Sequence, residues 1–422
     1  MITSNSPSIE LSPFKLLLAD RVRTHRKAIF EWQMAHTRIA PPPFYSSIDL
    51  RDSGHKIAPV DSNLFPAGFN NICPEDHRTA PPILRAQLEA IASRLHLTPP
   101  QKILILPESH TTNLYYAENL AYLIQILTHA DFEVVLGWLG GSEPVTLKTQ
   151  SGKQLTAHSI TVNQGILRAG AFEPDFIISN NDFSNVYPAE LDHVKQPILP
   201  SHRLGWHTRK KSDHFLHYNR LAKEFAELIG IDPWLIQVAT EEVTPVNFNE
   251  EIGIQATADA VQRILDQTQA AYERHQIEKK PFAFIKNNSG TYGMGIMVVS
   301  SADEVLKMNR RTKNKMSIGK GKSAIHSVVV QEGIATATLV DRLPAEPVIY
   351  LAGGELIGGF LRTNTERGAE DNLNSQGMVF KKLCMSELRE YEAEGETSEP
   401  MLELVYGTIA RISALAAGKE SL

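Results

Sequence analysis

The sequence predicts an α/β fold in which an N-terminal domain with an open, mostly parallel sheet precedes an α+β domain of two subdomains. In the first half, short apolar runs alternate with amphipathic stretches, which is typical of strands and helices in α/β proteins. In the second half, strand-like runs pair around short glycine-containing turns, which indicates antiparallel hairpins. The pattern breaks near residues 243–248. We therefore predict domains at residues 1–240, 241–335 and 336–422.

The first half begins with a predicted helix from Pro13 to about His36, because Ser12 can cap it and proline suits the first helical position. Residues 39–82 are rich in Pro, Asn, Ser and Asp, which predicts irregular structure. The rest of this half predicts helices at 82–95, 115–128 and 214–229, strands at 102–106, 132–136 and 176–178, and a hairpin over 145–157.

The second half opens with a long predicted helix near residues 257–275. Two apolar runs, 282–285 and 296–299, then read as buried strands on either side of a glycine-rich loop. Beyond them the sequence predicts a helix at 303–309, a basic polar stretch at 310–322, strands at 328–330, 348–351 and 356–361, and a helix at 401–417.

Composition argues against several classes of function. The net charge of −6 over 422 residues gives no reason to expect nucleic-acid binding. No apolar run approaches a membrane span, and the N-terminus lacks the pattern of a signal peptide. The two cysteines, Cys73 and Cys384, lie far apart and predict no disulfide framework. We therefore expect a cytoplasmic protein.

The most informative motif is the glycine-rich loop after Lys286. It joins strand to strand with glycines spaced G-x-x-G-x-G, unlike a dinucleotide-binding or Walker A loop. The backbone N–H groups of such a hairpin can cover a phosphate chain, and Lys286 would supply a point charge. The alternative is an ordinary hairpin whose glycines allow positive φ. The candidate phosphate-binding residues are Lys286, Ser289, Gly290, Thr291, Tyr292, Gly293 and Gly295.

Polar loops follow two strands of the predicted parallel sheet, where open sheets bind ligands. The first loop contains Glu108, His110 and Asn113, and the second contains Asn181 and Asp182. These carboxylates and amides suit the ammonium and carboxylate groups of an amino acid. Either loop alone fits turn and helix-cap chemistry slightly better, whereas the two together favour a small polar substrate.

A basic segment with an aromatic residue inside it contains Arg203 and Arg209. It could bind a substrate carboxylate or phosphate, or it could be a solvated face. Further along, Gln331, Glu332 and Ile334 follow a buried strand. A carboxylate and backbone groups in that position would suit adenine and ribose.

Arg362 ends a predicted strand and is followed by oxygen-bearing side chains. Mg²⁺ binds a few protein oxygens together with nucleotide phosphates. Arg362 could neutralise charge on a phosphoryl group during transfer. The alternative for this segment is a solvent-exposed loop.

The chain resembles the ATP-grasp superfamily through four features that come in the same order. These are Lys286 with its glycine hairpin, Gln331-Glu332-Gly333-Ile334, Arg362, and Asn372-Leu373-Asn374-Ser375-Gln376-Gly377. Nearly the whole chain also resembles a small bacterial family of glutamate–cysteine ligases, through segments 70–74, 107–111, 179–182 and 205–212.

The resemblance implies an ATP- and Mg²⁺-dependent ligase that joins glutamate and cysteine into γ-glutamylcysteine through an acyl phosphate, the first step of glutathione biosynthesis. It implies catalytic roles for Lys286 and Arg362 and structural roles for the two cysteines. It implies nucleotide contacts by Gln331, Glu332, Ile334 and Asn372. The Mg²⁺ candidates Glu346, Asp371 and Asn374 are chosen by their position and chemistry. Glutamate, cysteine and ATP would be its partners, and a homo-oligomer stays open.

Two departures from the superfamily keep alternatives open. The helix from Thr257 offers no clear second ATP-binding lysine, and nothing after Gly377 matches a late Glu-x-Asn metal motif. One alternative is an ATP-grasp ligase that joins another carboxylate and amine. The other is a non-catalytic nucleotide-binding protein.

Overall fold

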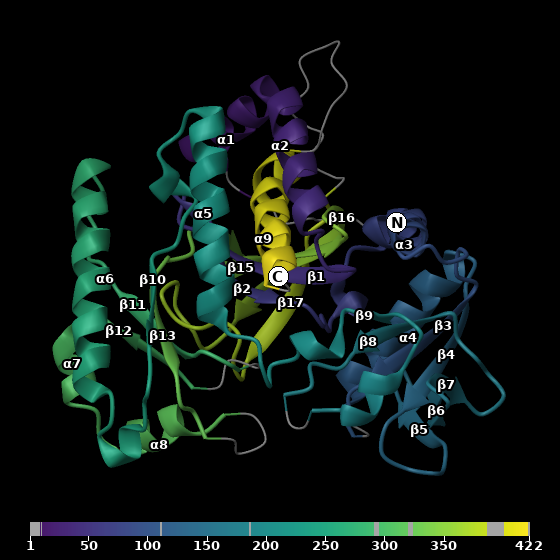
Figure 1. Cartoon of the computed structure of the whole chain (residues 1–422). Helices are drawn as coiled ribbons and strands as arrows, with labels where there is room; N and C mark the ends of the chain where they lie inside the picture. The colour runs from purple at the N-terminus through teal and green to yellow at the C-terminus, as the bar shows by residue number, and fades with distance from the viewer. Residues whose placement is uncertain are drawn as a thin grey trace.

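The computed structural model describes residue 9 and residues 11–109, 112–184, 187–290, 295–319, 324–385 and 401–420. The strands in these ranges form three sheets, which we call the central, the small antiparallel and the parallel sheet. Figure 1 shows the small antiparallel sheet at the left, the central sheet in the middle and the parallel sheet at the right. The central sheet therefore separates the other two.

The central sheet is antiparallel and joins strands from both ends of the chain. Its order is β17 (Met378–Lys382), β16 (Glu355–Asn364), β15 (Leu343–Ala352), β1 (Tyr45–Asp52) and β2 (Ile57–Asn63), and β14 (Leu339–Val340) pairs with β15. β1 lies between β15 and β2, so all eight of its residues are buried. Its side chains alternate between the two faces of the sheet. Ile48 and Leu50 pack into the helical core, and Asp49 and Arg51 face a pocket on the other side.

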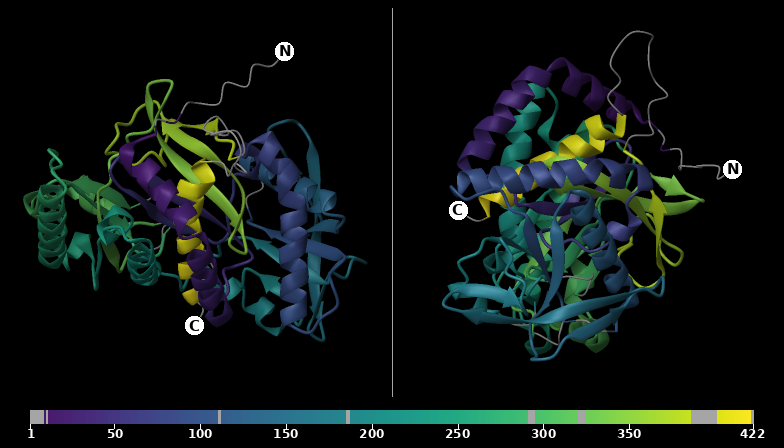
Figure 2. Two further views of the ribbon diagram at one scale, coloured as in Figure 1. Left: turned by 90° about the horizontal axis from the view of Figure 1, so that it is seen from above. Right: turned by 90° about the vertical axis from the view of Figure 1, so that its right-hand side faces the viewer.

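Long helices cover one face of the central sheet (Figure 2). They are α1 (Pro13–Thr24), α2 (Arg26–Ile39), α5 (Lys211–Ile229) and α9 (Thr408–Lys419), with a π-helical turn, η7 (Glu403–Gly407), before α9. The predicted N-terminal cap is confirmed, because the Ser12 hydroxyl accepts a hydrogen bond from the backbone N–H of Lys15 at 3.3 Å. α3 (Pro74–Arg94) packs between the central and parallel sheets, where Leu84 shares a core with Tyr350 and Ile105.

The small antiparallel sheet carries the glycine loop. Its order is β10 (Thr240–Val243), β13 (Val328–Glu332), β11 (Ala283–Asn287) and β12 (Ile296–Val299). α6 (Ile254–Arg274) packs on this sheet through residues such as Val261 and Ile264, and α7 (Ala302–Leu306) and α8 (Arg310–Ser317) follow β12. β11 and β12 form the predicted hairpin, with Lys286 opposite Ile296.

The parallel sheet has the order β5 (Val145–Lys148), β6 (Gln154–Asn163), β4 (Glu133–Trp138), β3 (Lys102–Pro107), β8 (Phe176–Asn180) and β9 (Ile198–Leu199), and β7 (Ile166–Ala169) pairs with β6. All of its pairings from β6 to β9 along this order are parallel. α4 (Leu114–His129) packs on it, and its Leu120 and Leu123 share a core with Ile103 and Ile105. Short 3₁₀ turns occur at Phe69–Asn71, Ala189–His193, His202–Leu204, Pro233–Leu235 and Phe248–Glu250.

The predicted α/β class, with a mostly parallel sheet and antiparallel hairpins, is confirmed. The prediction of irregular structure over residues 39–82 was wrong, because β1, β2 and the first two turns of α3 lie there. The basic polar stretch at 310–322 contains α8. β1 and β2 pair with strands from beyond residue 336, so one sheet crosses the proposed boundary at residue 240. The three domain boundaries stay a prediction.

Cys73 and Cys384 form a disulfide, with their Cα atoms 5.3 Å apart, so the expectation of no disulfide was wrong. Cys73 caps α3 and Cys384 follows β17. The two meet because the central sheet brings the C-terminal strands beside the segment that leads into α3, and sequence separation says nothing about this distance. No helix in the part of the chain that the structure describes is long and apolar enough to cross a membrane.

Candidate functional site

Two pockets lie beside the central sheet and share Arg362 and Asn374. The charged pocket is lined by Asp49, Arg51, Val60, Asp61, Lys211, Phe284, Lys286, Asn287, Gly290, Ile296, Glu346, Arg362, Asn372 and Asn374. The aromatic pocket is lined by Ser47, Asn63, Phe65, Pro66, Ala67, Glu108, Asp182, Trp206, Val348, Tyr350, Phe360, Arg362, Asn374, Met378 and Phe380. The first lies between the central and small antiparallel sheets, and the second between the central and parallel sheets.

Ion pairs across three strands organise the charged pocket. Glu346 on β15 is the register partner of Arg362 on β16. The Nη1 atom of Arg362 donates to Glu346 Oε1 at 2.8 Å and to Asp49 Oδ2 at 2.7 Å. Arg51 Nε donates to Glu346 Oε2 at 2.6 Å. Two arginines and two carboxylates therefore hold one another in place before any ligand binds.

The two carboxylates of this cluster differ in their pKa. Burial raises the pKa of Asp49, and Arg362 opposes this only in part. Burial also acts on Glu346, but Arg51 and Arg362 outweigh it and hold the pKa of Glu346 below its ordinary value. In the described part of the chain, the buried Oδ1 of Asp49 has no hydrogen-bond partner. A cation placed at Oδ1 would therefore stabilise the ionised form of Asp49.

Two lysines, Lys286 and Lys211, also line this pocket. Lys286 Nζ donates to Gln331 Oε1 at 2.6 Å and to the carbonyl of Val60 at 2.9 Å. Burial lowers the pKa of Lys286 to about 8. Lys211, at the start of α5, pairs with Asp61 of β2. Burial acts to raise the pKa of Asp61, but Lys211 and Lys286 outweigh it and lower that pKa to about 2.

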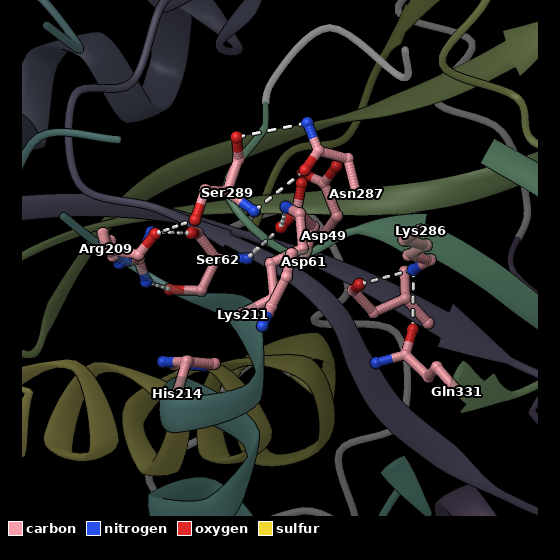
Figure 3. A network of polar contacts seen from close by, with 12 residues as sticks. Asp49, Asp61, Ser62, Arg209, Lys211, His214, Lys286, Asn287, Ser289 and Gln331 are labelled. Atoms are coloured by element: carbon pink, nitrogen blue, oxygen red, sulfur yellow. Dashed lines mark hydrogen bonds and ion pairs between the residues drawn. The ribbon is translucent and has the colours of Figure 1, made fainter. Parts of the chain in front are cut away.

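Figure 3 shows these groups together, with Asp61 and Lys211 lying between the pair Lys286–Gln331 and the pair Arg209–Ser62. The glycine loop is tied to α5 close by. The backbone N–H of Lys211 donates to the carbonyl of Asn288 at 2.8 Å, and the Ser289 hydroxyl donates to the carbonyl of Arg209 at 3.0 Å. The loop that is predicted to cover phosphates is thus anchored at its root.

The residues of the charged pocket fit a nucleotide phosphate chain and Mg²⁺. The residues that line this pocket include four cationic side chains and three carboxylates, so one positive charge is left for an anion. Mg²⁺ prefers carboxylate and amide oxygens, and Asp49, Glu346, Asn372 and Asn374 supply both kinds. The buried Nε2 of Gln331, at the end of β13, also has no partner among the described residues.

The aromatic pocket receives its carboxylates from the parallel sheet. Glu108 directly follows β3 and Asp182 comes two residues after β8. β3 and β8 are adjacent and parallel, with Pro107 opposite Asn180, so the two loops leave the same edge of the sheet. Tyr116 fixes this edge, because its hydroxyl accepts from the Glu108 backbone N–H at 2.9 Å and donates to the Asn180 carbonyl at 2.6 Å.

Other predicted residues of these loops have structural partners. Asn113 caps α4 by accepting from the backbone N–H of Tyr116 at 3.1 Å. Asn181 donates to the carbonyl of Pro107 at 3.2 Å, which ties the two loops together. His110, Thr291, Tyr292 and Gly293 lie outside the described residues.

The structure does not bring the two predicted arginines of the basic segment into the pockets. Arg203 is 68% exposed and pairs with Asp192. Arg209 is buried and binds Glu420 through Nε at 2.6 Å and Nη2 at 2.9 Å. Arg209 therefore ties the end of the chain to the start of α5.

Some of the predicted nucleotide and metal residues line the charged pocket, and others have partners elsewhere in the protein. Glu332 accepts from Lys56 at 2.7 Å and from Trp234 Nε1 at 3.1 Å, and Ile334 lies in the helical core. The carboxylate of Asp371 accepts from the backbone N–H of Gly368 at 2.8 Å. The structure brings together Lys286, Gly290, Glu346, Arg362, Asn372 and Asn374.

Sequence reasoning missed Asp49, Arg51 and Asp61. Lys211 belongs to the basic segment predicted to bind an anion, but it was not chosen as a site residue. The signal for the first two was alternation, since Asp49 and Arg51 alternate with Ile48 and Leu50 in a run that fits a strand. Nothing in the sequence indicated that Lys211 turns toward Asp61. Their proximity depends on the pairing of β1 with β15 and on the packing of α5.

Comparisons with known proteins identify the family of this chain. A family model described as glutamate–cysteine ligase matches residues 19–421. A crystal structure from Methylobacillus flagellatus KT, described as a "putative gamma-glutamylcysteine synthetase", is 34% identical, covers 99% of both chains and has a TM-score of 0.87. A search of curated proteins finds no match.

Two distant solved structures also match. D-alanyl-alanine synthetase A from Vibrio cholerae is 15% identical over 74% of this chain and 79% of its own, with a TM-score of 0.32. A glutathione synthetase-like effector from Globodera pallida is 11% identical over 87% of this chain and 84% of its own, with a TM-score of 0.38. The family model and the Methylobacillus structure each match nearly the whole chain. The chain therefore belongs to the glutamate–cysteine ligase family.

Proposed function

We propose that this protein joins the γ-carboxylate of L-glutamate to the amine of L-cysteine, with ATP and Mg²⁺, to give γ-glutamylcysteine. The observation that carries the proposal is that the charged and aromatic pockets meet at Arg362. A nucleotide phosphate chain in the first pocket and an amino acid in the second would lie within reach of the same guanidinium.

The reaction has two steps. An oxygen of the glutamate γ-carboxylate attacks the terminal phosphorus of ATP, and ADP leaves. The cysteine amine then attacks the acyl carbon of the resulting acyl phosphate, and phosphate leaves with the formation of the amide bond. The first step brings two anions together, so the protein must neutralise charge and hold the reactants in line.

The residues of the charged pocket would perform these tasks. Lys286 and Lys211 would bind phosphate oxygens, and Arg362 would bind the transferring phosphoryl group and the attacking carboxylate. Asp49, Glu346, Asn372 and Asn374 would hold Mg²⁺, which when bound neutralises phosphate charge. The glycine loop would exclude water, because water would hydrolyse the acyl phosphate.

The first experiment measures ADP release with ATP and Mg²⁺ and with glutamate and cysteine, each alone and both together. The product is identified by mass spectrometry. We expect full turnover only with both amino acids, a γ-glutamylcysteine product, and loss of turnover when EDTA removes Mg²⁺. Tight ATP binding without turnover would exclude this amino-acid pair and direct the search to other carboxylates and amines.

A cytoplasmic location and a homo-oligomer remain predictions. Cell fractionation tests the location, and size-exclusion chromatography with light scattering tests the oligomeric state.

A further inference from the structure

We propose that the aromatic pocket binds the amino acid whose side-chain carboxylate is phosphorylated, and that Glu108 and Asp182 bind its α-ammonium group. This inference rests on the proposed ligase function. It adds which of the two amino acids occupies this pocket and which residues select it.

The first argument comes from the junction of the pockets. The carboxylate that receives the phosphoryl group must lie beside the nucleotide, so it must reach the residues that both pockets share. Arg362 is one of them, and its Nη1 is taken by Asp49 and Glu346. Its Nε is buried and has no partner among the described residues. A substrate carboxylate at the junction would satisfy this N–H group.

The second argument comes from the wall that the parallel sheet provides. Glu108 and Asp182 are 7% and 6% exposed, and both line the aromatic pocket while neither lines the charged pocket. Buried carboxylates repel a substrate carboxylate and favour an ammonium group. An amine held there lies away from the junction, so it fits a bound α-ammonium better than the amine that attacks the acyl phosphate.

The third argument comes from the space between these walls. Phe65, Val348, Tyr350 and Phe360 line the pocket with mostly apolar surface, which suits the methylenes of a side chain. The cavity measures about 160 Å³, against about 50 Å³ for the charged pocket, whose own ion pairs fill it. The γ-carboxylate, the two methylenes and the α-ammonium of glutamate match this order of groups, and its α-carboxylate must then lie away from Glu108 and Asp182.

The geometry therefore predicts how the enzyme selects its donor. Glutarate has the same chain and both carboxylates of glutamate but lacks the ammonium group, so it should be a poor donor. Aspartate is one methylene shorter, so it should reach only one end of the pocket at a time.

The test compares the variants Glu108→Gln and Asp182→Asn with the wild type in steady-state kinetics. KM is measured separately for glutamate, cysteine and ATP, and glutarate is tested as donor. We expect KM for glutamate to rise about 10- to 100-fold, the range of one charged hydrogen bond. KM for cysteine and ATP should stay unchanged, and the preference for glutamate over glutarate should fall by a similar factor.

Two further variants separate recognition from folding. Glu190→Gln removes a carboxylate from an exposed 3₁₀ turn and should change none of these constants. Glu108→Asp keeps the charge and should retain part of the preference for glutamate over glutarate. If Glu108→Gln and Asp182→Asn do not fold, Glu108→Asp tests the assignment through the same KM values, and a wild type that accepts glutarate as readily as glutamate would still overturn it.

The outcomes distinguish this inference from the proposed function. A rise in KM for cysteine with an unchanged KM for glutamate would assign the pocket to the acceptor and overturn the inference, while the ligase activity stands. Unchanged constants in both folded variants, or a wild type that accepts glutarate as readily as glutamate, would also overturn it. A wild type that makes no γ-glutamylcysteine would overturn the proposed function itself.

Discussion

The charged and aromatic pockets share Arg362 but are built in different ways. In the charged pocket, most ionised side chains already pair with one another, as in Arg51–Glu346 and Lys211–Asp61. In the aromatic pocket, Glu108 and Asp182 border a space that aromatic, aliphatic and polar side chains line together. A ligand of the charged pocket must therefore replace ion-pair partners within the protein, whereas the aromatic pocket offers a cavity of about 160 Å³.

Arg362 gives the largest expected effect, because it belongs to both pockets. In Arg362→Met, Asp49 and Glu346 lose a cation inside the protein, which costs about 3–5 kcal/mol of unfolding free energy. We expect kcat to fall at least ~100-fold, as for the loss of one group that stabilises transition-state charge. Denaturant unfolding and turnover measure the two effects. Arg362→Lys, which keeps the charge, should recover stability more than activity, and near-normal turnover in Arg362→Met would show that the pockets do not meet functionally.

Removing the disulfide tests whether the aromatic pocket can be perturbed without a change in the charged pocket. Cys384 follows β17, whose Met378 and Phe380 line that pocket. We expect the double variant Cys73→Ser/Cys384→Ser to lose about 2–5 kcal/mol of unfolding free energy. KM for glutamate should rise while KM for ATP stays constant. The wild type in excess reductant should behave like the variant, and equal changes in both KM values would contradict the separation of the pockets.

Lys286 makes the charged pocket sensitive to pH. Burial lowers its pKa to about 8, so the lysine loses its charge as pH rises through 8. We expect kcat/KM for ATP to fall about tenfold per pH unit above this value, with no matching change in KM for glutamate. Lys286→Arg stays charged and should remove this limb of the profile; a limb that persists in this variant would assign it to another group.

The same shift affects stability with a defined sign. The pKa of Lys286 lies below its ordinary value of 10.5, so between pH 8 and 10.5 the unfolded chain binds the proton and the folded chain does not. This group therefore makes the unfolding free energy rise with pH by about 1.4 kcal/mol per unit in that window. Its contribution is lost as pH falls through 8. Urea unfolding of the wild type and of Lys286→Met isolates it.

Arg203 gives the smallest expected effect, because it belongs to neither pocket. It is 68% exposed and pairs with Asp192 on the surface, and such pairs contribute about 0–1 kcal/mol. We expect Arg203→Ala to unfold at nearly the same urea concentration and to keep every KM. A clear increase in any KM would show that the basic segment contacts a substrate.

Elements whose pattern is local were predictable. β3 and β8 are short apolar runs, and α4 combines an amphipathic pattern with a capping asparagine. β1 was missed because its alternation brings Ser47, Asp49 and Arg51 to one face, and polar residues are usually read as exposed. They are buried because β15 and β2 flank the strand and other charges compensate theirs.

The lining of the charged pocket was predictable where one segment carries a whole motif. Lys286 with its glycines, Arg362, and Asn372 with Asn374 are such cases, and all four residues line the charged pocket. Asp371 was chosen by position, but its carboxylate binds the turn that contains it. Arg203 and Arg209 were chosen for their charge, and ion pairs elsewhere account for both.

The sequence by itself determined the alternation of strands and helices, the glycine hairpin and the residue types of the site, because these depend on neighbours along the chain. Only the tertiary structure decided that Arg51 meets Glu346, 295 residues away, and that Cys73 bonds to Cys384. Such contacts depend on which strands pair and which faces pack, and many distant segments share the local pattern that permits them. The central sheet makes this choice, because it pairs β1 with β15 and so completes the charged pocket.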